Sequence, residues 1–338
     1  MKGAATLATT FILLLIVAIA SLCIGRYPIP LHELSAFFLS SFNIADATCH
    51  SVACSILAHI RLPRLGAALL TGAALSVSGA SYQAVFRNPL VSPGILGALS
   101  GAGFGAALGI ILNVSQWMIG ASAFAGSTLA VLLGTGIARL SGDSSVLMLI
   151  FGGLVSNALF TALLSILKYL ADPDSQLPDI VFWLLGTLSR VTPETLSLVT
   201  IPMICAMAVL CIMGRYLDAL SMGDDEARSL GVPVRLVRNL VVTLATLLCA
   251  LTVSMTGIIG WVGLVIPHIA RLLVGPGNRL VLPMSALTGA IFLTFSDDLA
   301  RNLSAAEIPV GIMTELSGVI LFLLLLPRVK TSLRGNWR

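Results

Sequence analysis

Long apolar runs recur from one end of this chain to the other. Of 338 residues, 57% are hydrophobic and 10% are charged, which leaves too little polar surface to cover a soluble globule of this length. A membrane-spanning helix needs about 20 apolar residues. Ten runs satisfy this, at about 7–26, 62–84, 94–113, 117–138, 146–168, 194–214, 238–256, 257–274, 280–302 and 309–327. We therefore expect an all-α polytopic membrane protein with one domain over residues 1–338.

Two apolar segments need separate interpretation. Residues 178–187 are too few to cross a bilayer and predict a short re-entrant helix buried against the bundle. The first run, with small residues at Ala18 and Ala20, also fits a signal peptide. We favour an uncleaved span, because its removal would leave nine helices and spoil the charge pattern of the loops.

The basic residues of the loops predict the orientation, because Lys and Arg are retained on the cytoplasmic side. With the N-terminus inside, the cytoplasmic set is Lys2, Arg87, Arg139, Arg215, Arg228, Arg235, Arg238, Arg271, Arg279, Arg328, Lys330, Arg334 and Arg338. The external set is Arg26, Arg61, Arg64, Lys168, Arg190 and Arg301. Both termini are therefore expected in the cytoplasm, and the net charge of +4 requires no nucleic-acid partner.

A polar segment at 214–239 interrupts the apolar runs. It holds four of the fifteen acidic and four of the nineteen basic residues, and the charge count places it in the cytoplasm. Residues 224–230 predict a short amphipathic helix, with acidic side chains at its start and Gly231 and Pro233 at its end. Such a helix would transmit motion of a partner protein to the adjoining spans; the alternative is a solvated loop.

Sequence motifs of common enzymes are absent. The chain has no His-Glu-x-x-His, no Gly-x-Ser-x-Gly and no phosphate-binding loop, and none of its three lysines follows a glycine. If nucleotide drives this protein, another chain binds it. We expect no enzymatic activity, no cofactor and no metal site.

Cys49 and Cys54 lie in an external loop of about 27–60, together with His50 and His59. A local disulfide, or two free thiols, in an oxidising compartment is favoured. A metal-binding loop is the alternative, but a lone Cys-His pair lacks a second spaced pair of ligands.

Charged residues near the spans are candidate functional residues, because each costs about 2.5–3.5 kcal/mol at a helix centre. Arg61 and Arg64 begin the second span and Arg301 ends the ninth. All three oppose the positive-inside preference and predict a docking patch for an acidic partner, with snorkelling anchors as the alternative. Glu315 lies about one and a half turns into the last span; its alternative roles are pairing with Arg301 or capping backbone.

Two short motifs echo one another. Leu90-Val-Ser-Pro93 follows the second span and Leu264-Val-Ile-Pro267 follows the seventh. The charge count predicts that they lie on opposite sides of the membrane, as in the inverted repeats of many transporters.

Further groups of residues occur in a fixed order over about 60–325. They are Arg61-Leu-Pro-Arg64, Tyr82-Gln, Arg87-Asn-Pro-Leu90, Glu226-Ala-Arg-Ser-Leu-Gly231, Val262-Gly-Leu-Val-Ile-Pro-His268, Ala300-Arg301 and Glu307-Ile-Pro-Val-Gly311. Together they resemble the permease subunits of type II ABC importers for iron-siderophores, haem and cobalamin.

The resemblance implies a ten-helix permease fold in the cell inner membrane, paired with itself as a homodimer or with a paralogous permease. The solute path would lie between the subunits, with two cytoplasmic ATPase subunits and an external substrate-binding protein as further partners besides membrane lipid. Arg61, Arg64 and Arg301 would receive acidic residues of the binding protein.

Residues 214–238, here named the coupling segment, would seat on the ATPase. Its expected contact residues are Tyr216, Gly223, Glu226, Ala227, Arg228, Leu230 and Gly231. The expected constrictions of the path are Asn88, Pro89, Leu90, Ser144 and Ser145.

The last span departs from the family pattern at Glu315, where a small residue is usual, and it lacks the usual Gly-x-Pro. Glu315 is predicted to favour a cationic or metal-bearing solute. We expect a permease for ferric siderophore, with cobalamin, haem and molybdate as alternative solutes. A secondary carrier driven by an ion gradient, with no ATPase, is the alternative from another class.

Overall fold

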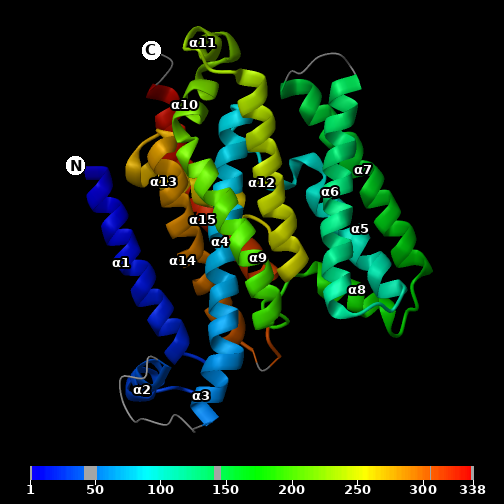
Figure 1. Ribbon diagram of the computed structural model, residues 1–338, viewed down its shortest axis with the longest axis vertical. Coiled ribbons are helices and arrows are strands. Elements are labelled where there is room, and N and C mark those ends of the chain that lie inside the picture. The colour runs from blue at the N-terminus through cyan, green and yellow to red at the C-terminus, as the bar shows by residue number, and fades with distance from the viewer. Residues whose placement is uncertain (1, 42–51, 141–145, 305, 336–338) are drawn as a thin grey trace.

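The computed structural model describes residues 2–41, 52–140, 146–304 and 306–335, which are helical with no β-strand (Figure 1). The long or apolar helices are α1 (Lys2–Cys23), α4 (Leu62–Phe86), α5 (Ala98–Ile111), α6 (Gln116–Leu140), α7 (Val146–Leu170), α9 (Pro193–Ile212), α12 (Val234–Thr256), α13 (Val262–Val274), α14 (Asn278–Asn302) and α15 (Val310–Gly335). The shorter ones are α2 (Leu31–Ser41), α3 (Val52–Ile56), α8 (Gln176–Leu184), α10 (Gly214–Met222) and α11 (Asp224–Ser229), with a π-turn η1 (Leu57–Arg61) and a 3₁₀ turn η2 (Pro93–Leu96).

The predicted spans coincide with these helices. Within the described residues, seven helices are long and apolar enough to cross a membrane, and three shorter apolar ones, α5, α13 and the first part of α15, complete the ten. The short apolar segment at 178–187 forms α8, which packs against α5. The expectation of an all-α, ten-span membrane protein is confirmed.

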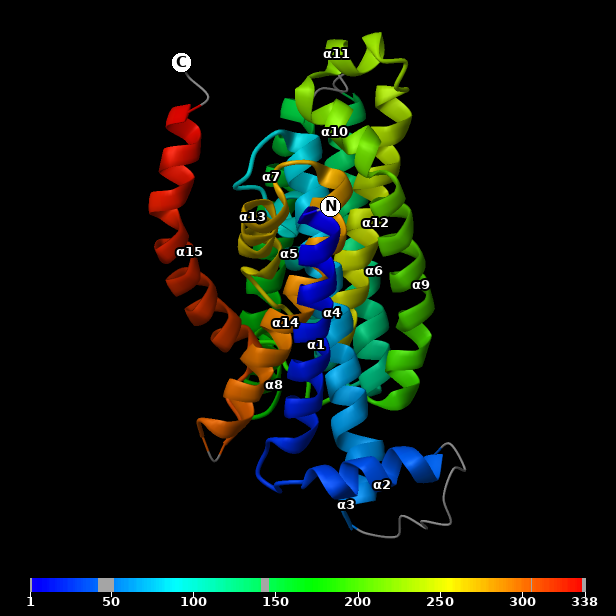
Figure 2. The same cartoon turned by 90° about the vertical axis from the view of Figure 1, so that its left-hand side faces the viewer.

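The molecule has two distinct ends. Helices α10 and α11 cap one end, here named the α11 end, and α2 and α3 lie across the opposite one, the α2 end (Figures 1 and 2). The start of α1 and the end of α15 lie in the half of the molecule that carries α11 (Figure 2). The functional residues described below lie at one of these two ends or in the helix bundle between them.

Helix α4 is the centre of the bundle, in contact with α9, α12, α13 and α14. Glycines allow these backbones to approach closely, which is how helices associate where lipid supplies no hydrophobic driving force. A Cβ on Gly79 would overlap the carbonyl oxygen of Gly263 in α13 and lie 2.7 Å from its Cα. A Cβ on Gly72 would likewise overlap the carbonyl of Gly289 in α14.

The two echoing motifs meet in space, so the prediction that they lie on opposite sides of the membrane is wrong. The Gln83 amide donates to the carbonyls of Val91 and Leu264, at 3.4 and 3.2 Å. The reason is that α13, with 13 residues, is only about 20 Å long. It begins inside the bundle, beside the chain that leads into η2, instead of at the far surface.

The α4–α13 crossing yields a stability prediction. Gly79→Ala should destabilise the folded protein by about 1–3 kcal/mol or more, because the added methyl meets backbone that cannot rotate away. The measurement is the fraction of monodisperse protein left after heating in detergent. Gly136→Ala in α6 is the matched control, since nothing lies within 4 Å of its added Cβ; equal losses in the two variants would contradict the close-packing argument.

Candidate functional site

Helix α10 attaches the coupling segment to the bundle. It begins directly after α9, and Gly214 packs so closely on the start of α14 that an added Cβ would lie 2.8 Å from the Cα of Arg279. The Asp218 carboxylate accepts a hydrogen bond from the backbone N–H of Asn278 at 2.6 Å. An acidic side chain at this position also complements the helix dipole of α14.

Helix α11 is held by one carboxylate and one buried methyl. The Asp224 carboxylate accepts from Arg238 of α12 at 2.6 Å and lies 3.6 Å from Arg87, which ends α4. Burial acts to raise the pKa of Asp224, but these arginines outweigh it and hold the pKa below its ordinary value. The ion pair is therefore intact at neutral pH and is lost only as the pH falls through this lowered pKa. Ala227 is fully buried beneath the helix.

The predicted amphipathic helix is thus confirmed, with Gly231 in the left-handed region (φ 77°) at its end. Its outer side carries Glu226 and Arg228, the latter paired with Asp225 at 2.7 Å. Four large apolar side chains of the coupling segment are also exposed, namely Tyr216 (46%), Met222 (67%), Leu230 (63%) and Leu236 (67%). Exposed apolar groups on an otherwise polar cap indicate a contact surface for another protein.

Arg61, Arg64 and Arg301, the arginines predicted to form a docking patch, come together at the α2 end, where they are buried. Arg64 of α4 donates to both oxygens of Asp297 in α14, at 2.9–3.1 Å, and to Glu307 at 2.8 Å. Arg301 bonds to Asp298 and lies 3.3 Å from Asp297. Because a carboxylate binds a guanidinium through two oxygens, the first of these pairs is geometrically specific.

Arg61 closes this network from η1. It donates to the backbone carbonyls of Leu22 and Tyr27, while the Ser21 hydroxyl donates to Asp298 at 2.7 Å. The three arginines are 5–9% exposed and brace α1, α4 and α14 against one another. Their role in docking a binding protein stays a prediction, and Arg301 pairs with neighbouring aspartates instead of with Glu315.

The candidate path residues lie in different places. Asn88, Pro89 and Leu90 are exposed at the α11 end, where the Asn88 side chain accepts from the backbone N–H of Leu90 at 2.9 Å. Ser144 and Ser145 lie outside the described residues. Glu315 is exposed in the first part of α15, and its carboxylate lies 3.5 Å from a Cβ built on Gly260.

Glu315 adjoins a region of non-helical backbone that the sequence did not indicate. The loop after α8 and the loop between α12 and α13 meet there, with the N–H of Thr187 donating to the carbonyl of Thr256 at 2.7 Å. Gly186, Gly257 and Trp261 all have positive φ, at 70°, 73° and 67°. Irregular backbone at membrane depth is tolerated only where it is buried in protein or lines a water-filled cavity.

The loop at 27–60 that carries Cys49 and Cys54 is described in part. Cys54 is disulfide-bonded, in agreement with the favoured interpretation, whereas Cys49 and His50 lie outside the described residues. The His59 ring lies 3.2 Å from the carbonyl of Ser55 and is exposed. Over the described part of the chain, no group of three or more potential metal ligands comes together.

The arginine network supports a test of its own. Asp297→Asn should cost about 3–5 kcal/mol of stability, because it leaves two buried arginines without their shared charge. Replacing the pair by apolar groups, Arg64→Met with Asp297→Leu, should restore most of the loss. The measurement is thermal unfolding in detergent of the single and double variants; unchanged stability in Asp297→Asn would leave docking as the better account of these residues.

Comparison with known proteins matches residues 13–328 to the FecCD transport family. The Haemophilus influenzae molybdate import system permease protein MolB is 37% identical over 326 residues, covering 94% of both chains. The Yersinia pestis hemin transport system permease protein HmuU is 38% identical over 338 residues, covering 96% of both. A solved inward-facing structure of a putative metal-chelate type ABC transporter superimposes with a TM-score of 0.85 at 37% identity, covering 95% of this chain and 98% of that one.

These relatives are permeases, which are not enzymes, and ATP hydrolysis belongs to a separate subunit. The family match implies a multi-pass permease that works with an ATPase and a substrate-binding protein. It confirms the family that the sequence motifs resemble. This chain is the permease of a type II ABC importer and belongs to the FecCD transport family.

Proposed function

We propose that the chain forms a homodimer in the cell inner membrane and passes a metal chelate inward, with ferric siderophore as the first candidate, along a path between the two subunits. The observation that carries this proposal is the exposed carboxylate of Glu315, the one charged side chain in the first part of α15, Val310–Leu325. Haem and cobalamin are alternative solutes of the same size class.

Glu315 indicates which face of the helix bundle is in contact with water. The carboxylate lies five residues beyond the start of α15, about 7.5 Å into the helix. An ionised group that faces hydrocarbon is expensive, so intramembrane carboxylates face a bundle interior or a water-filled cavity. The non-helical backbone beside Glu315 must likewise be buried in protein or line a water-filled cavity. Both observations support a water-lined path on this side of α15, completed by a second subunit.

The same carboxylate bears on the choice of solute. The chain is similar to a molybdate permease as well as to a hemin permease, and molybdate is an oxyanion. Two symmetry-related carboxylates beside the path would repel a small anion, whereas they would tolerate a neutral or cationic metal chelate. This argument favours the chelate over molybdate.

Orientation and coupling follow from the two ends. The excess of Lys and Arg at the α11 end supports a cytoplasmic location for it and for both termini, and the disulfide at Cys54 fits an oxidising compartment at the other end. Two ATPase subunits would then seat on α10 and α11, and a substrate-binding protein would dock at the α2 end. Leu230 is the better anchor for the ATPase, because it is exposed while Ala227 is buried.

One prediction of this proposal concerns selectivity between solutes. In vesicles that hold the permease with its ATPase and binding protein, Glu315→Gln should raise molybdate uptake relative to ferric chelate by about fivefold or more, since one charge contributes on the order of 1–4 kcal/mol at contact distance. The measurement is competitive ATP-dependent uptake of labelled molybdate and ferric siderophore. Unchanged rate and selectivity, in this variant and in Glu315→Ala, would remove the path assignment of Glu315.

The second prediction concerns coupling. Leu230→Asp should lower transport and substrate-stimulated ATP hydrolysis roughly tenfold or more, because it places a charge in the centre of an apolar contact, while folding remains normal. Leu112→Asp, at the opposite end of the molecule and equally exposed at 63%, controls for the added charge. The measurement is co-purification of the ATPase with each variant; full retention by Leu230→Asp would place the ATPase contact elsewhere.

A further inference from the structure

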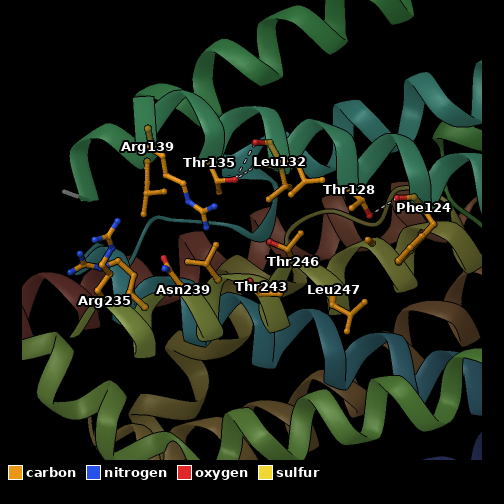
Figure 3. Close-up of a pocket in the computed structure, with 16 residues that line it drawn as sticks. Phe124, Thr128, Leu132, Thr135, Arg139, Arg235, Asn239, Thr243, Thr246 and Leu247 are labelled. Atoms are coloured by element: carbon orange, nitrogen blue, oxygen red, sulfur yellow. Dashed lines mark hydrogen bonds between the residues drawn. The ribbon is translucent and has the colours of Figure 1, made fainter. Parts of the chain in front are cut away.

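A narrow groove runs between α6 and α12 (Figure 3). It encloses a cavity volume of about 230 Å³ and is open along one side. It is lined by α6, α12 and Leu149 of α7, and not by α15, which carries Glu315. The transport path does not account for it.

The lining changes character along the groove. Arg139 of α6 and Arg235 of α12 lie together at one end, and Phe124 and Leu247 lie toward the other (Figure 3). Between them are polar but uncharged side chains, including Thr135 and Asn239. Both helices present this order because the lining positions on each recur at intervals of three or four residues, which places them on one face.

The charged end of the groove is positive, and two of its arginines have no ion pair within the described part of the chain. Arg139 and Arg235 are exposed, and neither has an acidic partner among the described residues. The neighbouring Arg238 differs, because it is buried and bonded to Asp224. That aspartate also lies 3.6 Å from Arg87, so its charge is already shared. Arg139 and Arg235 can therefore bind an anion at this end of the groove.

The length of the groove matches one leaflet of a bilayer. The lining runs from Phe124 to Arg139 on α6 and from Arg235 to Ala250 on α12, which is about 22 Å on each helix at 1.5 Å per residue. Half of the hydrocarbon core is about 15 Å, and the headgroup region adds about 5–8 Å. A groove of this length, with apolar and uncharged polar side chains along it and arginines at one end, matches a phospholipid in length and in the charge of its headgroup.

We propose that this groove binds one anionic phospholipid from the leaflet at the α11 end. Its phosphate lies between Arg139 and Arg235, and one acyl chain lies along the α6–α12 seam toward Phe124. Basic pockets between membrane helices bind acidic headgroups in this way. Arg235 is one helical turn from Arg238, which holds α11 through Asp224, so the lipid supports the helix on which the coupling segment is mounted.

The test measures lipid binding to the detergent-purified full chain by native mass spectrometry, with phosphatidylglycerol and phosphatidylcholine as probes. The double variant Arg139→Gln/Arg235→Gln should bind phosphatidylglycerol roughly thirtyfold more weakly, at about 1 kcal/mol for each arginine, with little change for phosphatidylcholine. The double variant Arg215→Gln/Arg279→Gln is the matched control, because it removes two charges at the same end outside the groove and should retain binding.

Two further arms test the acyl chain. Thr243→Trp keeps both arginines but fills the groove and should abolish tight binding of phosphatidylglycerol. Inorganic phosphate in millimolar excess should not displace the lipid, because it lacks the chain. Equal losses in the two arginine double variants, an unaffected Thr243→Trp variant or displacement by phosphate would each overturn the proposal. Elution volume and thermal stability of every variant identify any loss that is due to unfolding.

Discussion

The hydrocarbon of a membrane offers no partner for a backbone or side-chain hydrogen bond, and most features of this structure follow from that constraint. It accounts for the all-helical chain, since a helix satisfies its own backbone. It also accounts for the arrangement of the exceptions. The loops near Gly186 and Gly257 bond to one another through Thr187 and Thr256. Gln83 donates to the carbonyl of Val91, between α4 and η2, and to that of Leu264 in the first turn of α13.

The close helix crossings around α4 make this arrangement possible. Gly79 against Gly263 and Gly72 against Gly289 bring backbone onto backbone, which allows the short helix α13 to begin inside the bundle. Larger residues at these positions would separate the helices and leave the polar atoms of the loops too far apart to bond. Small residues in the sequence thus control the positions of polar groups that are distant from them along the chain.

The two ends of the molecule differ in how far their arginines are buried and paired. At the α2 end Arg64 and Arg301 pair with Asp297 and Asp298, and Arg61 donates to backbone carbonyls. These contacts hold the helices together inside the protein. At the α11 end Asp224 anchors α11, while Leu230 and several arginines, including Arg139 and Arg235, are exposed. In the orientation proposed above, the importer would have a braced external end and a cytoplasmic end with exposed contact surface for the ATPase.

Periodicity and local signals in the sequence were sufficient for the ten spans, for the short helix α8 and for α11 with its terminal glycine, because each depends on residues within one or two turns. The pairing of Arg301 with Asp297 was also accessible, at i,i+4 within one helix. The partners of Arg64 and Gln83 were not, since Asp297 and Leu264 lie 233 and 181 positions away. Only the packing of α4 against α13 and α14 brings those atoms together, because hydrogen bonds act over a few ångströms of space and carry no signature in local sequence.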